Sequence, residues 1–219
     1  MAPRLALPGE LQDFHRVVAA ADGETLVDFE DQSTDVYFIV AGEVRVLLRT
    51  AAGKEVILAD LKAGEFFGEL AAIDGIPRSA NVTALTKADL CIMPSTVFRE
   101  ILFTANEACD KVLKLLAHRV RDGNTRLAEM SIFDLRHRLY SELLRMSHPR
   151  PGHPGMKVVS PPPFHHVMAA RIGCRREQVT RELSTMSAEG LLEKTRGALV
   201  LTKPQVLEQR LAVAMAEGD

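Results

Sequence analysis

The stretch of sequence that decides the fold lies near the C-terminus, where residues 169–183 read AARIGCRREQVTREL. Helical patterns of apolar residues cover residues 165–172 and 175–190, and Gly173 and Cys174 separate them. Glycine adopts the positive φ that a tight turn needs. The pattern therefore predicts two short helices joined by a glycine turn.

The charge of the chain changes along its length, although the 219 residues together carry only −2. Residues 1–134 contain 14 Lys and Arg against 21 Asp and Glu, whereas residues 135–219 contain 13 against 8. An acidic half followed by a basic half indicates two functions. Because a polyanion attracts Lys and Arg, the basic half favours nucleic acid as its partner.

Residues 24–97 show the pattern of short β-strands. Four segments are rich in Val, Ile, Leu and Phe, and turns that contain Gly42, Gly53 and Gly64 separate them. Short strands at even spacing indicate a barrel or a roll. The predicted strands cover residues 36–40, 44–48, 55–61 and 88–93.

A long helix is predicted over residues 107–133, which contain no proline. Its apolar residues recur at alternating spacings of three and four, which is the heptad pattern of a coiled coil. We expect a symmetric homodimer in which two such helices pair; the alternative is packing of the stripe against its own β domain. The stripe consists of Leu113, Leu116, Val120, Gly123, Leu127 and Met130.

Shorter elements flank the long helix. Ser95 is expected to cap a helix that runs to Leu102, and Asp134 is expected to cap a helix over residues 135–146. Toward the C-terminus the pattern predicts strands over residues 156–159, 191–194 and 198–201 and a last helix over residues 204–216.

Several classes of protein are excluded by what the sequence lacks. No run of about 18 apolar residues could form a transmembrane helix, and the N-terminus has no signal-peptide pattern, so we expect a cytoplasmic protein without a membrane partner. Cys91, Cys109 and Cys174 are scattered, which argues against disulfides, structural zinc and an iron–sulfur cluster. Because Walker, G-x-S-x-G and H-E-x-x-H motifs are missing, we expect no catalytic residues, no metal and no enzyme activity.

Two motifs in sequence order together resemble those of the CRP/FNR family of bacterial regulators. The first, GEFFGELA at 64–71 continued by PRSA at 77–80, is similar to the phosphate-binding cassette of cyclic-nucleotide-binding domains. The second, at 169–183, is similar to the family's helix-turn-helix. The resemblance implies an α+β fold with a cyclic-nucleotide-binding β-roll at 1–106, a long dimerisation helix at 107–134 and a winged helix-turn-helix DNA-binding domain at 135–219.

The cassette contains the groups that a cyclic phosphate needs. Backbone N–H groups at a helix start and one guanidinium can hold a compact monoanion, which assigns the phosphate to the helix start at Glu69 and Leu70 and to Arg78. Gly68 allows close approach of the backbone, and Ser79 adds a hydrogen bond. The resemblance implies that Glu69 accepts from the ribose 2′-hydroxyl. The alternative is an ion pair between Glu69 and Arg78 in an empty roll.

The base end of the nucleotide site departs from the family's pattern. In members that bind cyclic AMP, a Thr and a Ser of the long helix contact the adenine, and the matching positions here are Gly123 and Asn124. Gly123 has no hydroxyl, whereas Asn124 can both donate and accept. By resemblance Arg119 extends toward the ligand; the alternative is a solvated position on the helix. The expected allosteric effector is cyclic AMP, then cyclic GMP, and then a cyclic dinucleotide, which would not need this cassette.

The second helix of the C-terminal motif carries the candidate DNA contacts. Arg176, Glu177 and Arg181 occupy the family's three base-reading positions. Arg can bind guanine in the major groove, and Glu can accept from the cytosine amine. The resemblance implies pseudo-palindromic promoter DNA with TGTGA-like half-sites. The residues assigned to phosphates, which position the protein without reading sequence, are Arg175, Gln178, Thr180 and Lys194.

These assignments predict a homodimeric transcription regulator in which the nucleotide shifts the population between two arrangements of the dimer helices. RNA polymerase is the expected protein partner. The alternatives are a ligand-independent regulator of the same fold and, from another class, a cyclic-nucleotide-processing enzyme. His165 and His166 begin the first helix of the motif and are further candidates for phosphate contact, but adjacent helical side chains point in different directions and do not form a metal site.

Overall fold

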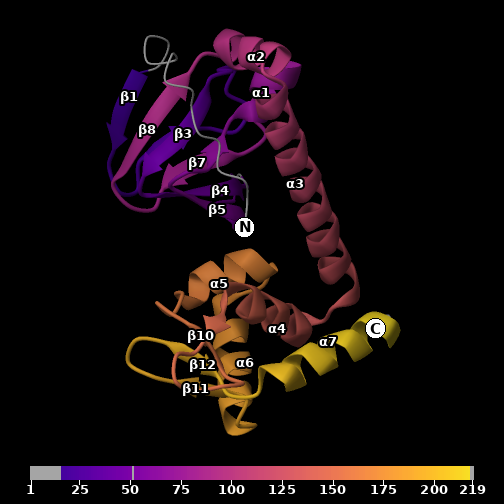
Figure 1. The fold of residues 1–219 in the computed structure, drawn as a ribbon. Coiled ribbons are helices and arrows are strands. Elements are labelled where there is room, and N and C mark those ends of the chain that lie inside the picture. The colour runs from indigo at the N-terminus through magenta and orange to yellow at the C-terminus, as the bar shows by residue number, and fades with distance from the viewer. Residues whose placement is uncertain (1–15, 51, 218–219) are drawn as a thin grey trace. The chain divides into compact units, whose positions relative to one another are not determined.

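The computed structural model describes residues 16–50 and 52–217, which fold into two compact units that divide between Val120 and Arg121 (Figure 1). The first unit is rich in strands and the second in helices. The long helix α3 (Asn106–Ile132) begins in the first unit and ends in the second. The mixed α+β architecture predicted from the sequence is confirmed.

The first unit contains two four-stranded sheets whose pairings are antiparallel. The four predicted strands are present as β3, β4, β5 and β8, and four shorter strands complete the sheets. In spatial order, one sheet consists of β1 (Arg16–Ala20), β8 (Ala88–Met93), β3 (Val36–Ala41) and β6 (Phe66–Phe67), and the other of β2 (Thr25–Val27), β7 (Asn81–Ala84), β4 (Glu43–Arg49) and β5 (Glu55–Lys62).

Three helices accompany these sheets: α1 (Glu69–Asp74), α2 (Ser95–Thr104) and the first part of α3. Phe98 of α2 and Val112 and Leu115 of α3 are buried against strand residues, which fastens α3 to the unit. The prediction for Ser95 was wrong. Pro94 is the cap residue of α2, and the Ser95 hydroxyl lies 2.9 Å from that of Thr34 because Ser95 already belongs to the helix.

The second unit begins with the end of α3 and continues through α4 (Leu135–Met146), which Asp134 caps as predicted by accepting a 2.8 Å hydrogen bond from the backbone of His137. A small sheet in the order β11-β12-β10-β9 supports the helices. The remaining elements are β9 (His148–Pro149), β10 (Lys157–Val159), α5 (His165–Ile172), α6 (Arg176–Ala188), β11 (Leu192–Lys194), β12 (Leu199–Leu201) and α7 (Pro204–Glu217).

The core of the second unit joins α4, α5, α6 and the sheet. Val179 and Leu183 of α6 are fully buried there beside Leu139 of α4 and Met168 of α5. Arg176, Glu177, Thr180, Arg181 and Ser184 of α6 are exposed, so the core fixes which face of α6 meets solvent. The two helices at 165–172 and 175–190 are therefore present almost as predicted.

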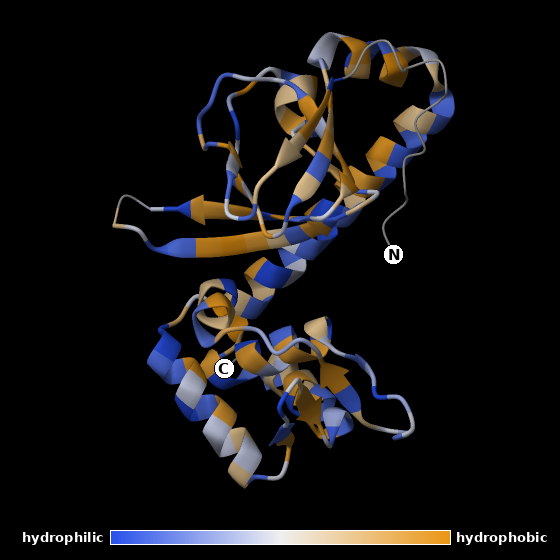
Figure 2. Cartoon of the chain, turned by 90° about the vertical axis from the view of Figure 1, so that its left-hand side faces the viewer, coloured by the Kyte–Doolittle hydropathy of each residue, from blue (hydrophilic) through white to orange (hydrophobic). Residues whose placement is uncertain are grey.

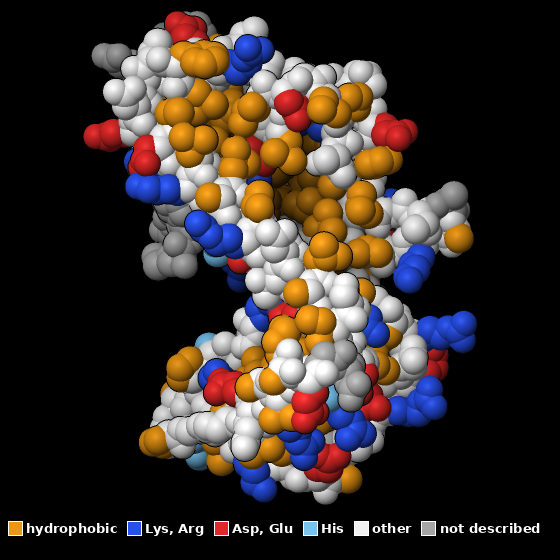
Figure 3. Space-filling view, turned by 90° about the vertical axis from the view of Figure 1, so that its right-hand side faces the viewer, with side chains coloured by type: hydrophobic (Ala, Val, Ile, Leu, Met, Phe, Trp, Pro, Cys, Tyr) orange, Lys and Arg blue, Asp and Glu red, His pale blue; other side chains and the backbone are white. Residues whose placement is uncertain are grey.

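Apolar and polar residues alternate along α3 (Figure 2), and much of its predicted apolar stripe is uncovered. Leu113 and Val120 are each 61% exposed, Leu127 is 67% exposed and Met130 is 45% exposed. Apolar side chains also gather on the surface of the first unit in Figure 3. In the described part of the chain, no helix is long and apolar enough to cross a membrane.

Candidate functional site

The predicted phosphate cassette surrounds the start of α1. Gly68 precedes this helix with φ of +88°, in the left-handed region that favours glycine. A Cβ at this position would lie 2.6 Å from both Nη1 of Arg78 and the backbone oxygen of Asp35. Glycine is needed here for two reasons, because it accepts the backbone conformation and because it leaves room for the Arg78 guanidinium.

Arg78 is held inside the first unit, with only 3% of its surface exposed. Its Nε donates to Ser33 Oγ at 3.1 Å, Nη1 to the backbone oxygen of Gly68 at 3.1 Å, and Nη2 to that of Asp35 at 2.8 Å. A guanidinium has five N–H donors, so these three bonds leave donors over. Among the described residues, no carboxylate forms an ion pair with Arg78, although its charge is near enough to Asp31 to help lower the pKa of that carboxyl.

A small hollow brings the cassette residues together. Gly68, Leu70, Arg78 and Ser79 all line it, with Val27, Ala71 and Ala80 as the apolar remainder. Ser79 is exposed, whereas Arg78 is buried. Four of the predicted ligand residues thus share one surface, and Ser33 and Asp35, which sequence reasoning did not select, position the guanidinium.

Glu69 does not pair with Arg78, so the alternative of an ion pair between them is wrong. Its side chain is buried and accepts a hydrogen bond from Nη1 of Arg119 on α3. Nη2 of Arg119 donates to the backbone oxygen of Phe66 at 2.9 Å. Arg119 is therefore anchored at the cassette and is not a solvated position on the helix. The sequence analysis assigns both residues to the ligand but does not predict that they pair with each other across fifty positions.

The two positions expected to contact the base follow Arg119 on α3 and belong to the second unit. Gly123 and Asn124 are both exposed. A Cβ at Gly123 would meet nothing within 4 Å. Within residues 16–50 and 52–217, Asn124 makes no side-chain hydrogen bond, so its donor and acceptor are both available.

The candidate DNA interface lies on α6 and the elements beside it. Gly173 ends α5 with φ of +70° and forms the predicted turn. The prediction that α6 includes Arg175 was wrong by one residue, because Arg175 is the cap residue. Its backbone N–H donates to Gln178 Oε1 at 3.0 Å. Gln178 therefore uses its oxygen to close the helix start and keeps its amide hydrogens for other partners.

The three predicted base-reading side chains, Arg176, Glu177 and Arg181, are exposed on α6. In the part of the chain that the structure describes, none of them makes a side-chain hydrogen bond or ion pair. Arg175 is likewise exposed and unpaired there, and Lys194 is exposed at the end of β11. The structure thus presents a row of unpaired charged groups on the outward face of α6.

Thr180 is the predicted phosphate residue with the most internal contacts. Its hydroxyl donates to the backbone oxygen of Arg176 at 3.1 Å and lies 2.7 Å from Nδ1 of His165 on α5. Burial, followed by the positive charges of Lys194 and Arg176, lowers the pKa of His165 below its ordinary value of 6.5. Lys194, Arg176 and His165 are therefore close enough to influence one another.

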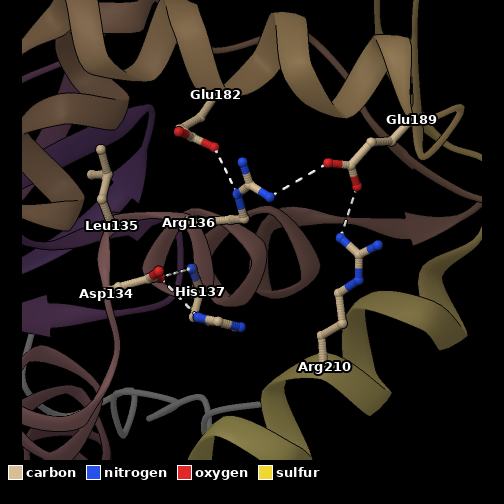
Figure 4. Close-up of a pocket in the computed structure, with 7 residues that line it drawn as sticks. All are labelled: Asp134, Leu135, Arg136, His137, Glu182, Glu189 and Arg210. Carbon is tan, nitrogen blue, oxygen red and sulfur yellow. Dashed lines mark hydrogen bonds and ion pairs between the residues drawn. The ribbon is translucent and has the colours of Figure 1, made fainter. Parts of the chain in front are cut away.

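A charged pocket between α4, α6 and α7 was not predicted (Figure 4). Arg136 donates to Glu182 at 3.0 Å and to Glu189 at 3.4 Å, and Arg210 of α7 donates to Glu189 at 2.8 Å. Because Arg136 and Arg210 are paired with Glu182 and Glu189, these four groups neutralise one another and hold α7 against α4 and α6. Across the described residues, no group of three or more His, Cys, Asp or Glu could hold a metal ion.

A second charged network joins the C-terminal end of α3 to α4 and α5. Arg145 of α4 binds both oxygens of Glu129 at 2.8 and 2.7 Å and also pairs with Glu142. Glu142 is 2% exposed and accepts from Arg171 of α5 at 3.2 Å. Glu142 and Arg145 have the i,i+3 spacing of a pair within one helix. The contacts to Glu129 and Arg171 join separate helices and have no such spacing, so sequence reasoning missed them.

Comparisons with known proteins fit this arrangement of two units. The cyclic nucleotide-binding domain family matches residues 17–105, and the Crp-like helix-turn-helix domain family matches residues 137–210. The cyclic AMP receptor protein of Thermus thermophilus is 27% identical over 179 residues, which cover 82% of this chain and 80% of that protein.

Solved structures share the fold. A CooA variant from Carboxydothermus hydrogenoformans has a TM-score of 0.79 at 21% identity, with 93% of this chain and 90% of that chain covered. The c-di-GMP responsive global regulator CLP of Xanthomonas campestris has a TM-score of 0.74 at 20% identity, with 86% and 94% covered. The two domain matches stand in the same order as the two folded units, and this chain is a member of the CRP/FNR family of transcription regulators, with a cyclic nucleotide-binding domain followed by a Crp-like helix-turn-helix domain.

Proposed function

We propose that this regulator binds cyclic AMP and, as a homodimer, responds to it by binding promoter DNA. The observation that carries the proposal is the burial of the Arg78 guanidinium without a carboxylate partner among the described residues. A buried unpaired charge is costly. A cyclic phosphate at the hollow would place a negative charge in direct contact with Arg78 and occupy donors that Arg78 does not use internally.

The remaining cassette groups complement the rest of the nucleotide. Ser79 hydrogen-bonds the phosphate, and the backbone at Gly68 and Leu70 lies close to it. Glu69, which is already ionically paired with Arg119, accepts the ribose 2′-hydroxyl. Arg119 thereby connects the bound nucleotide to α3. Gly123 and Asn124 follow on the same helix and provide the base end, where cyclic GMP is the second candidate effector.

Dimerisation is proposed to occur along α3. The exposed Leu113, Val120 and Leu127 form a stripe that a second copy would remove from water. We propose the sensor at 1–106, the dimerisation helix at 107–134 and the DNA-binding domain at 135–219. The nucleotide would favour one arrangement of the paired helices, in which two copies of α6 lie about one DNA turn, 34–36 Å, apart.

The proposed DNA site is a pseudo-palindrome of TGTGA-like half-sites. Arg176 and Arg181 are free to bind guanines, and Glu177 is free to accept from a cytosine amine. Arg175, Gln178, Thr180 and Lys194 contact phosphates. Such a regulator acts in the cytoplasm, engages RNA polymerase at its promoters and turns over no nucleotide. A turnover assay with cyclic AMP tests the last statement.

Titration calorimetry of the purified protein tests the sensing role. Cyclic AMP should bind more tightly than cyclic GMP. Cyclic di-GMP belongs in the same series because the relative CLP is described as responsive to it. Arg78→Ala should abolish binding of the monocyclic nucleotides. The matched control is Arg49→Ala, since Arg49 pairs with Glu55 at the surface, and it should bind as the parent does. Failure of all three nucleotides to bind would favour a ligand-independent regulator.

The DNA-reading role is tested with duplexes that vary one base pair at a time. Glu177→Ala should lower discrimination at one base pair by about 1–3 kcal/mol while leaving binding to an unrelated duplex unchanged. Glu208→Ala on α7 is a suitable control because Glu208 pairs with Lys157. Equal weakening on every sequence would exclude a base-reading role for Glu177.

A further inference from the structure

The first residue of α5, His165, has a hydrogen bond that determines where its proton lies. Its Nδ1 is 2.7 Å from the hydroxyl oxygen of Thr180, and that hydroxyl donates its hydrogen to the backbone oxygen of Arg176 at 3.1 Å. A hydroxyl has a single hydrogen, so Thr180 must accept from Nδ1–H of His165. In the neutral imidazole, Nε2 therefore has no hydrogen and can only accept.

The surroundings of His165 keep it in this neutral form. It is half-buried, and the charged groups that face it are Arg176 on α6 and Lys194 on β11. His166, its neighbour on α5, stacks on Phe164, with 5.5 Å between the two ring centroids. Burial comes first, followed by Lys194 and Arg176, in lowering the pKa of His165. No carboxylate is among the causes of this shift, and none of the described carboxylates forms an ion pair with His165.

The residues around His165 belong to the proposed DNA interface, because Arg176, Thr180 and Lys194 are all assigned to DNA contacts. A phosphate brought to this surface would oppose the two positive charges and favour a third. We propose that His165 takes up a proton when DNA binds and that its Nε2–H then donates to a backbone phosphate, so that DNA affinity depends on pH. This inference rests on the proposed DNA-binding function and adds to it the uptake of one proton by each subunit.

The direction of the effect follows from the two states. In free protein the imidazole pKa lies below 6.5, and in the complex the phosphate raises it. Between these two values, each subunit takes up one proton on binding, so affinity falls as pH rises, by up to about tenfold per pH unit for each subunit and about a hundredfold for a homodimer on two half-sites. Below both values, His165 is charged in both states, and above both it is neutral in both, so the dependence on pH disappears.

The experiment measures the dissociation constant for a synthetic duplex with two inverted TGTGA-like half-sites between about pH 5 and pH 8, at constant ionic strength, with and without cyclic AMP. An unrelated duplex is measured beside it, because a phosphate contact carries no sequence information. Both duplexes should bind more weakly as pH rises. Calorimetry in two buffers of different ionisation enthalpy should show uptake of protons by the unsubstituted protein.

Substitutions assign the proton to one histidine. His165→Asn retains a donor for Thr180 but cannot be charged, so it should lose this part of the pH dependence and bind with the affinity that the parent shows at high pH. His153→Asn, in the turn between β9 and β10, should retain the full dependence. If His166→Asn removes the dependence and His165→Asn does not, or if the parent binds DNA with no proton uptake, the inference is wrong. If neither duplex binds at any pH, the DNA-binding function itself is wrong.

Discussion

Replacing Gly68 by alanine tests the reasoning about the cassette most directly. The added Cβ meets two separate penalties. The backbone φ of +88° is unfavourable for any L-residue with a side chain, at about 1–2 kcal/mol. The Cβ also lies 2.6 Å from the Arg78 guanidinium and 2.6 Å from a backbone oxygen, and the second contact cannot be relieved by turning a side chain. Overpacking of this kind costs about 1–3 kcal/mol.

Gly75, at the other end of α1, separates the two penalties. Its φ is +73°, but a Cβ there meets nothing within 4 Å. Gly75→Ala should therefore lower the free energy of unfolding only by the cost of its positive φ. Gly68→Ala should lower it by about 1–3 kcal/mol more, because of the close contacts of its Cβ. Gly68→Ala should also lose nucleotide affinity because Arg78 is displaced, whereas Gly75→Ala should bind cyclic AMP as the parent does.

Urea denaturation, monitored by tyrosine fluorescence, measures the difference in unfolding free energy between the two variants. The chain has two tyrosines and no tryptophan, and Tyr37 and Tyr140 lie in different units. In a Tyr140→Phe background, Tyr37 reports on the first unit alone. Equal destabilisation by the two alanines, with unchanged nucleotide binding, would refute the packing argument for Gly68.

Three further predictions concern α3 and the second unit. Glu142→Gln leaves the buried Arg171 and the partly exposed Arg145 without their shared carboxylate, and thermal unfolding of the second unit should show a loss of about 3 kcal/mol; an unchanged transition would contradict this. Val120→Asp places a charge on the exposed stripe of α3, and sedimentation should show monomers at concentrations where the parent and a Lys114→Ala control are dimers. For Asp134, burial raises the pKa, but hydrogen bonds from His137 outweigh it and hold the pKa below 3.8; its contribution is therefore present above pH 3.8 and lost as pH falls through the folded-state value. Asp134→Ala should cost about 1 kcal/mol at neutral pH, with no difference from the parent at the acidic end of a pH series.

The elements with a regular pattern were predictable from sequence. The strands at 36–40, 44–48, 55–61 and 88–93 are long enough to show apolar runs between glycine turns, and the heptad pattern of α3 needs only one helix to be visible. In contrast, β2, β6 and β7 have two to four residues each. Strands this short are defined by their partners, which single-sequence patterns do not identify.

Within the candidate site, residue types were predictable and their pairings were not. Gly68 and Arg78 were selected for a ligand, but the contact between them, and the role of Ser33 in holding the guanidinium, depends on the folded geometry. The partner of Glu69 is Arg119, which lies on another element. Ser95 was misassigned because a serine at the first helical residue and a serine at the cap look alike in sequence.

The attachment of Glu129 to Arg145 has a practical consequence for dissecting the chain. Glu129 lies on the last turns of α3, yet its carboxylate binds Arg145 and the Ser141 hydroxyl of α4. A fragment that begins at Asp134 would therefore lack Glu129, one of the two carboxylates that bind Arg145, although it would contain all the helices of the DNA-binding domain. A fragment of the DNA-binding domain that keeps these contacts must therefore include the C-terminal end of α3.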